Sequence, residues 1–187
     1  MFYQRFAPIA SVLCTLNLAH TDSCVFAKNA LTSNTRFILE IQLEEDRSKD
    51  PLKAFWSYTL TERISGKKYQ GRIPQLEYHA HPTVYLSEDG KRFAILDPIA
   101  DHRDKDRFIV FTQDGKQIIS LGINDILNME EQSKVTSSIS HIRWLSLNEN
   151  TIGLFSKADN TVTLTTMLGR KVAISLTNGK IVKPVER

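Results

Sequence analysis

The chain has 187 residues, of which 41% are hydrophobic and 24% are charged, and its formal net charge is +3. These values are ordinary for a globular protein, which excludes a disordered, collagen-like or coiled-coil chain. The length allows one domain with a substantial core. The basic excess is small and forms no stripe of Lys and Arg between aromatic residues, so the sequence predicts no binding to nucleic acid.

The first 27 residues have the composition of a secretory signal peptide. A lone Arg5 precedes an apolar stretch over residues 6–19, and residues 25–27 (VFA) end in the small residue that a signal peptidase requires. The stretch is shorter than the roughly 20 residues that cross a bilayer, so no membrane span is predicted. We therefore expect a secreted or periplasmic protein with a single β-rich domain, residues 28–187.

Both cysteines, Cys14 and Cys24, fall within this first segment. A cut after Ala27 would leave a domain without thiols, which is compatible with an oxidising compartment but provides no disulfide framework. A lipoprotein processed just before Cys24 is the alternative. The residues before that cysteine (TDS) differ from the small apolar residues that normally precede a lipidated cysteine.

The first half of the expected domain reads as strands and tight turns. Residues 36–43 alternate between apolar and polar side chains, which predicts a strand with one buried face. Residues 54–60 and 68–70 flank a turn at Gly66 and predict a hairpin. Residues 84–96 and 107–119 then repeat one unit of apolar strand, polar glycine turn and apolar strand. Because these strands are apolar on both faces, they predict sheets stacked on one another.

The second half is interrupted once before strands resume. Residues 123, 126 and 127 are apolar at helical spacing, with Asn124 or Asp125 as the expected cap, and predict one short helix near 123–133. Residues 143–155 match the unit at 84–96, with Trp144 falling on Tyr85, and predict another such hairpin. Strands at 161–166, 171–176 and 181–182 follow, with turns at Gly169 and Gly179.

Grouped in this way, the hairpins predict an all-β fold of up to three stacked, antiparallel, four-stranded sheets. Gly66, Gly115 and Gly169 mark turns that look equivalent and recur about every fifty residues, a spacing typical of propeller blades. The alternative is a β-sandwich, since all hairpins need similar turns. Four aromatic residues at strand positions are expected to pack between the sheets: Trp56, Tyr58, Tyr85 and Trp144.

Two of these turns resemble a known family. Residues 87–94 (SEDGKRFA) are similar to the Ser-Pro-Asp-Gly-Lys turn of the WD40-like repeats in TolB-type β-propellers, and residues 112–116 (TQDGK) resemble it more weakly. The resemblance implies a propeller-like arrangement and a role as a scaffold for protein contacts in the bacterial envelope. A closed ring needs at least four blades, so three sheets either stack without closing or belong to an assembly of several copies.

The residues that could carry chemistry gather in two segments. His79 and His81 would project from one face of an extended segment, and Asp101, His102 and Asp104 follow in a charged loop. Together they could bind a ligand or share a metal ion, although the set lacks a firm third ligand. The alternative is a half-exposed strand followed by a solvated loop, and no cofactor is predicted.

Other catalytic signatures are lacking in the sequence of residues 28–187. There is no Cys, no Gly-x-Ser-x-Gly nucleophile turn, and no phosphate-binding loop with its Lys and Ser or Thr. We therefore expect a non-catalytic binding or scaffold module of the cell envelope or extracellular space, with a protein partner held by residues 77–82 and 98–106. The alternative is a metal-assisted hydrolase or lyase that acts on envelope polysaccharide or peptide through His79, His81 and His102.

Overall fold

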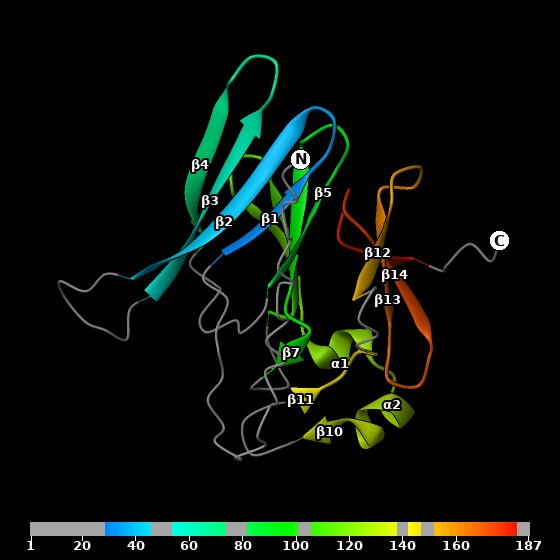
Figure 1. Ribbon diagram of the computed structural model, residues 1–187. Helices are drawn as coiled ribbons and strands as arrows, with labels where there is room; N and C mark the ends of the chain where they lie inside the picture. Colours follow the sequence, from blue (N-terminus) through cyan, green and yellow to red (C-terminus); the bar gives the residue numbers. More distant parts are fainter. Residues whose placement is uncertain are drawn as a thin grey trace, which may run out of the picture.

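The computed structural model describes residues 29–45, 54–73, 82–100, 106–137, 142–146 and 152–182. Within these ranges the chain forms three four-stranded antiparallel sheets, one small three-stranded sheet and two short helices (Figure 1). The predicted all-β class with stacked four-stranded sheets is confirmed. The three stacked sheets differ from the two of a β-sandwich.

The first sheet has the order β1-β2-β3-β4, with strands β1 (Asn29–Ser33), β2 (Phe37–Glu45), β3 (Ala54–Glu62) and β4 (Lys68–Ile73). Strand β2 alternates as predicted, with Leu39 and Ile41 buried and Glu40 and Gln42 exposed. The sequence did not reveal β1, because its short NALTS segment has no long apolar run. One face of this sheet is therefore core and the other is polar.

The second sheet, β5-β6-β8-β9, lies between the other two and is buried on both faces. Its strands are β5 (Thr83–Leu86), β6 (Arg92–Leu96), β8 (Phe108–Thr112) and β9 (Gln117–Leu121). Phe93 and Ile95 belong to the core shared with the first sheet, whereas Ala94 and Leu96 belong to the core shared with the third. This explains the strands without alternation, since neither face of such a strand meets water.

The third sheet corrects two predictions. Its strands are β12 (Gly153–Ser156), β13 (Thr161–Thr165), β14 (Lys171–Ser175) and β15 (Ile181–Val182), in that order. The hairpin predicted over residues 143–155 is wrong, because Leu145 pairs with Thr166 while β12 pairs with residues 161–164, so both segments run along β13. Gly169 therefore lies in the β13–β14 turn, and Gly179 takes the position equivalent to Gly66 and Gly115.

The predicted single helix is two helices, α1 (Ile123–Ile126) and α2 (Met129–Lys134). The break has a local cause. Leu127 and Asn128 are extended, and the Asn128 side chain accepts a hydrogen bond from the Glu131 backbone N–H at 2.9 Å, which starts a new helix. The predicted caps Asn124 and Asp125 are also wrong, since α1 begins after Gly122. Neither helix in the described ranges is long and apolar enough to cross a membrane.

Large side chains of one sheet pack directly against glycines of the neighbouring sheet. Gly90, in the β5–β6 turn, has φ +69°, and a Cβ added there would lie 2.6 Å from the Phe37 ring of the first sheet. Gly115 is similarly covered by the ring of Tyr58, whose hydroxyl donates to the Gln113 carbonyl at 3.2 Å. These glycines supply both the left-handed backbone and the space that the stacking requires.

The stack has two different ends. In each four-stranded sheet, the turn between the first and second strands and the turn between the third and fourth strands lie at the same end, which we call the turn end. There Asn34 of the first sheet donates a hydrogen bond to the Ser87 carbonyl of the second sheet at 3.0 Å. Lys157 of the third sheet forms an ion pair with Glu88 of the second sheet at 3.1 Å. The opposite or helical end holds α1, α2, the residue 166–170 turn and the small sheet β10 (Thr136–Ser137), β11 (Ile142–Arg143) and β7 (Ile99–Ala100) (Figure 1).

Candidate functional site

The predicted site residues lie outside the described residues. His79 and His81 fall in residues 74–81, and Asp101, His102 and Asp104 fall in residues 101–105. Ile73 and Pro82 flank the first segment, and Ala100 and Asp106 flank the second. These four described residues lie at the helical end. In the ranges that the structure describes, no group of three or more His, Cys, Asp or Glu residues could hold a metal ion.

A buried ion pair closes the base of the 98–106 segment. Arg107 Nη1 donates to Asp97 Oδ2 at 2.8 Å, and the two side chains are only 6% and 1% exposed. The Asp97 backbone N–H also donates to the Arg107 carbonyl at 2.8 Å, and Trp144 Nε1 donates to the Asp97 carbonyl at 3.2 Å. Removing one partner of such a pair is strongly destabilising, so the two ends of the segment are firmly held.

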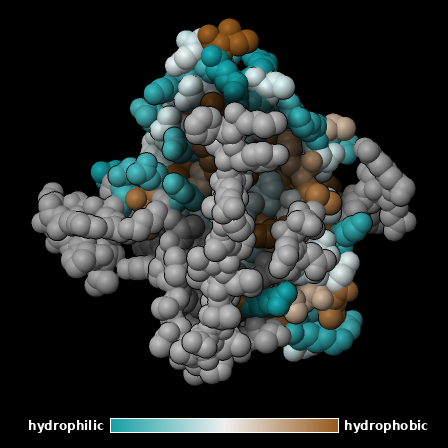
Figure 2. Space-filling view, viewed as in Figure 1, coloured by the Kyte–Doolittle hydropathy of each residue, from teal (hydrophilic) through white to brown (hydrophobic). Residues whose placement is uncertain are grey.

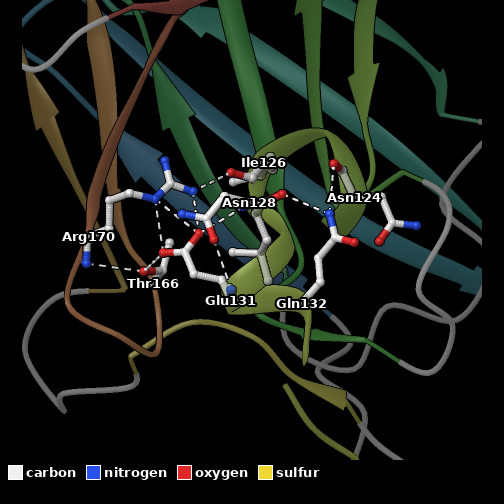
Figure 3. Close-up of polar contacts among 8 residues, drawn as sticks. Asn124, Ile126, Asn128, Glu131, Gln132, Thr166 and Arg170 are labelled. Atoms are coloured by element: carbon white, nitrogen blue, oxygen red, sulfur yellow. Dashed lines mark hydrogen bonds and ion pairs between the residues drawn. The ribbon is translucent and has the colours of Figure 1, made fainter. Parts of the chain in front are cut away.

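A second polar cluster joins α2 to the third sheet (Figure 3). The Glu131 carboxylate accepts hydrogen bonds from Thr166 Oγ1 at 2.6 Å, from Arg170 Nε at 2.9 Å and from Arg170 Nη2. It also accepts the Asn128 backbone N–H at 3.0 Å, while Arg170 Nη2 donates to the Ile126 carbonyl at 2.8 Å. One buried carboxylate thus fixes both helices against the 166–170 turn.

The position of Glu131 follows from a missing aspartate in that turn. In a turn of similar sequence but at a different place in its sheet, the β8–β9 turn, Thr112 Oγ1 accepts the Lys116 N–H at 3.0 Å and donates to the carboxylate of Asp114. Thr166 makes the same backbone contact to the Arg170 N–H at 3.1 Å, but Leu168 stands where Asp114 would be. Glu131 of α2 supplies the carboxylate instead. The only sign of this contact in the sequence is the leucine at position 168 in place of an aspartate.

The chemistry of Glu131 is that of a structural group. Burial of the carboxyl would raise its pKa, but hydrogen bonds from Arg170, Thr166 and the Asn128 N–H lower the pKa below the usual value for glutamate. A general base needs a pKa near neutrality and a free oxygen lone pair aimed at substrate. Glu131 is a stable anion whose oxygens are already bonded, so it anchors the helices.

A shallow hollow of about 250 Å³ lies on the exposed face of the first sheet. Its polar lining includes Glu40, Gln42 and Glu44 from β2. Ser57 Oγ donates to Glu44 Oε1 at 3.0 Å, and Gln70 Nε2 donates to Thr59 Oγ1 at 3.1 Å, so part of this lining is bonded to itself. The hollow is a polar surface with no enclosed pocket for a ligand.

The four aromatic candidates are core residues, as predicted. Trp56, Tyr58, Tyr85 and Trp144 are all buried between sheets or beneath the helical end. The Tyr85 hydroxyl has no hydrogen-bond partner in the described part of the chain, and burial raises its pKa. These residues stabilise the stack and are not available to a ligand.

The sequence matches no protein-family model, and no curated protein matches it. Among solved structures, the chain is similar to the crystal structure of HIRA(644-1017), at 7% sequence identity and a TM-score of 0.38. The match covers 85% of this chain and 53% of that one, so the chain spans about half the length of the structure that it matches. At this score the likeness carries no argument about function.

Proposed function

We propose that this protein is an exported, non-catalytic binding or scaffold module of the cell envelope or extracellular space, and that it recognises a protein partner through residues 77–82 and 98–106. The observation that carries the proposal is the anchored helical end, from which both segments leave. The Asp97–Arg107 ion pair fixes the base of the second segment, and the Glu131 cluster fixes the helices beside it.

Rigid supports favour recognition. Loops that project from a stable β scaffold commonly carry binding residues, and a partner is bound more tightly when less freedom is lost at the interface. The apolar leader supports export. The resemblance of residues 87–94 to TolB-type repeats supports a scaffold role of the kind that such propellers have in the envelope.

A pull-down from the envelope fraction of the exporting cell tests the proposal. In one variant, Asp101, His102 and Asp104 are replaced by Ser; in the control, Ala158 and Asp159, which lie at the turn end, are replaced by Ser. We expect the first variant to lose the captured protein and the control to retain it. Equal capture by both variants would contradict the proposed surface.

A separate measurement addresses the enzymatic alternative. The protein and its His79→Ala, His81→Ala, His102→Ala triple variant are incubated with a panel of polysaccharide and peptide substrates. We expect no turnover by either form. Turnover by the parent protein that the triple variant lacks would replace the scaffold proposal with a metal-assisted hydrolase.

A further inference from the structure

The turn end gathers basic residues from six turns that lie far apart in the sequence. The turns are residues 34–36, 63–67, 87–91, 113–116, 157–160 and 176–180. They hold seven Lys and Arg against four Asp and Glu, a net charge of +3 that equals the net charge of the whole chain. Each turn contributes at least one exposed basic side chain: Arg36, Lys67, Lys91, Lys116, Lys157 and Lys180.

Three of the four acidic residues are bonded in or beside their own turns, and the fourth, Glu88, pairs with Lys157 of the third sheet at 3.1 Å. Asp89 Oδ1 accepts Ser87 Oγ at 2.8 Å and the Lys91 N–H at 3.0 Å, and the Asp114 carboxylate accepts Thr112 Oγ1. Asp159 accepts Ser156 Oγ at 3.0 Å in the same manner. These three carboxylates therefore shape the backbone of the turns. Arg36 and Lys157 pair with Glu62 at 3.5 Å and with Glu88 at 3.1 Å, but their side chains are still 56% and 67% exposed.

One turn adds an exposed apolar side chain. Ile64 is 88% exposed, and Arg63 and Lys67 belong to the same turn. The β3–β4 hairpin that carries this turn is the highest part of the molecule in Figure 1, and Figure 2 shows an apolar spot at this apex, surrounded by hydrophilic surface. At this apex Ile64 adds an exposed aliphatic contact beside the basic residues of its turn.

We infer that the turn end docks on the surface of an anionic lipid bilayer. The basic tips would lie at the level of the negatively charged headgroups, and Ile64 would enter the boundary with the acyl chains. Stacked sheets lie about 10 Å apart, so the tips of three sheets spread charge over an area and not along a groove. An aliphatic tip within basic residues matches a bilayer surface, which offers anionic headgroups above an apolar interior.

Charge variants with a matched control test the inference. Binding of the full chain to vesicles of phosphatidylcholine, with and without phosphatidylglycerol, is measured by co-sedimentation. Each Lys near an anionic surface contributes about fivefold to binding, so Lys91→Gln with Lys116→Gln should weaken binding to the anionic vesicles about thirtyfold. Lys134→Gln with Lys171→Gln changes the net charge equally at the helical end and should leave binding unchanged.

The apolar contribution has its own matched pair. Ile64→Ser should weaken binding about tenfold, as expected when much of an aliphatic side chain is no longer buried. Leu168→Ser removes a side chain that is 45% exposed in a turn at the helical end, and should have no effect. All of the substituted positions are at the surface, and thermal unfolding of each variant verifies that the fold is retained.

The outcome separates this inference from the partner proposal. The apolar first 27 residues are common to all variants, so they cannot produce a difference between them. Equal binding to neutral and anionic vesicles, no binding to either, or equal weakening by the control variants would overturn the inference. So would turn-end variants that lose a captured protein but keep vesicle binding, whereas the loop variants at residues 101–104 should keep vesicle binding in every case.

Discussion

Replacing Glu131 by Gln tests whether one carboxylate fixes the helical end. The substitution keeps the shape of the side chain but removes its charge, and it places an amide N–H₂ against the guanidinium of Arg170. Glu131 is 3% exposed, so water cannot take over the lost contacts there. We therefore expect a measurable loss of stability rather than a neutral surface change.

The magnitude follows from the contacts. A hydrogen bond to a charged group contributes about 1.5–3 kcal/mol, and the carbonyl oxygen of the new amide could still accept from Thr166 or the Asn128 N–H. Loss of one partner of a fully buried pair costs about 3–5 kcal/mol, but the Arg170 side chain is 39% exposed and can be hydrated. We expect Glu131→Gln to lower the free energy of unfolding by about 2–3 kcal/mol and Tm by about 5–10 °C.

Urea unfolding, followed by the fluorescence of the two buried tryptophans, measures this free energy. Glu130→Gln is the control, because Glu130 is the exposed neighbour on α2 and pairs with Lys134 at 3.0 Å in an (i, i+4) arrangement. That pair contributes about 0.3–0.5 kcal/mol. The reasoning is refuted if Glu131→Gln costs no more than Glu130→Gln.

The same variant has a defined pH dependence. Because folding lowers the pKa of Glu131, its contribution to stability is fully present above the pKa of an unfolded glutamate and is lost as the pH falls through the folded value. The difference in unfolding free energy between the parent protein and Glu131→Gln should therefore be largest at neutral pH and shrink in acid. A difference that grows on acidification would contradict the assigned ionisation.

Two further predictions use matched residues. Gly90→Ala should cost about 3 kcal/mol, against about 1 for Gly66→Ala, because the two glycines share a positive φ but only Gly90 lies under the Phe37 ring; equal costs in urea unfolding would refute the steric reason. Tyr85→Phe should stabilise the protein by up to about 1 kcal/mol, since it removes a buried hydroxyl without a partner in the described residues, whereas Tyr58→Phe, which removes a hydrogen bond, should destabilise it by about 1 kcal/mol. Shifts of the same sign would show that the Tyr85 hydroxyl is satisfied.

The stacking of the sheets could be predicted from the sequence because burial has a simple period in strands. Alternation over residues 37–43 marks a sheet with one wet face, and its absence over residues 93–96 marks a sheet covered on both faces. In the third sheet the predicted succession of strands 161–166, 171–176 and 181–182 is confirmed, but the partner of residues 143–155 could not be predicted. The similarity of residues 143–155 to residues 84–96 lies in side chains, whereas pairing depends on which backbone edge is available, and β13 offers its edge to both segments.

The polar anchors were also beyond sequence reasoning, for a different reason. Asp97 and Arg107 are ten residues apart and flank a charged segment, and no sequence pattern indicates that they pair with each other. Glu131 and Thr166 are 35 residues apart, and only the fold brings α2 to the β13–β14 turn. The predicted site residues themselves, His79, His81, Asp101, His102 and Asp104, lie outside the described residues and stay predictions.

Whether three sheets can stack without closing into a ring depends on their outermost faces. In a closed ring every sheet is covered on both sides, so the strands of every sheet would be apolar on both faces, as those of the second sheet are. Those of the first sheet are not: Glu40 and Gln42 are exposed on the face that points away from the second sheet, and Glu44 accepts a hydrogen bond there from Ser57. Covering this face with another apolar sheet would remove the carboxylates of Glu40 and Glu44 from water, at a cost of several kcal/mol each. The polar face therefore marks one end of the stack, as the wet outer face of a capping repeat does in a solenoid.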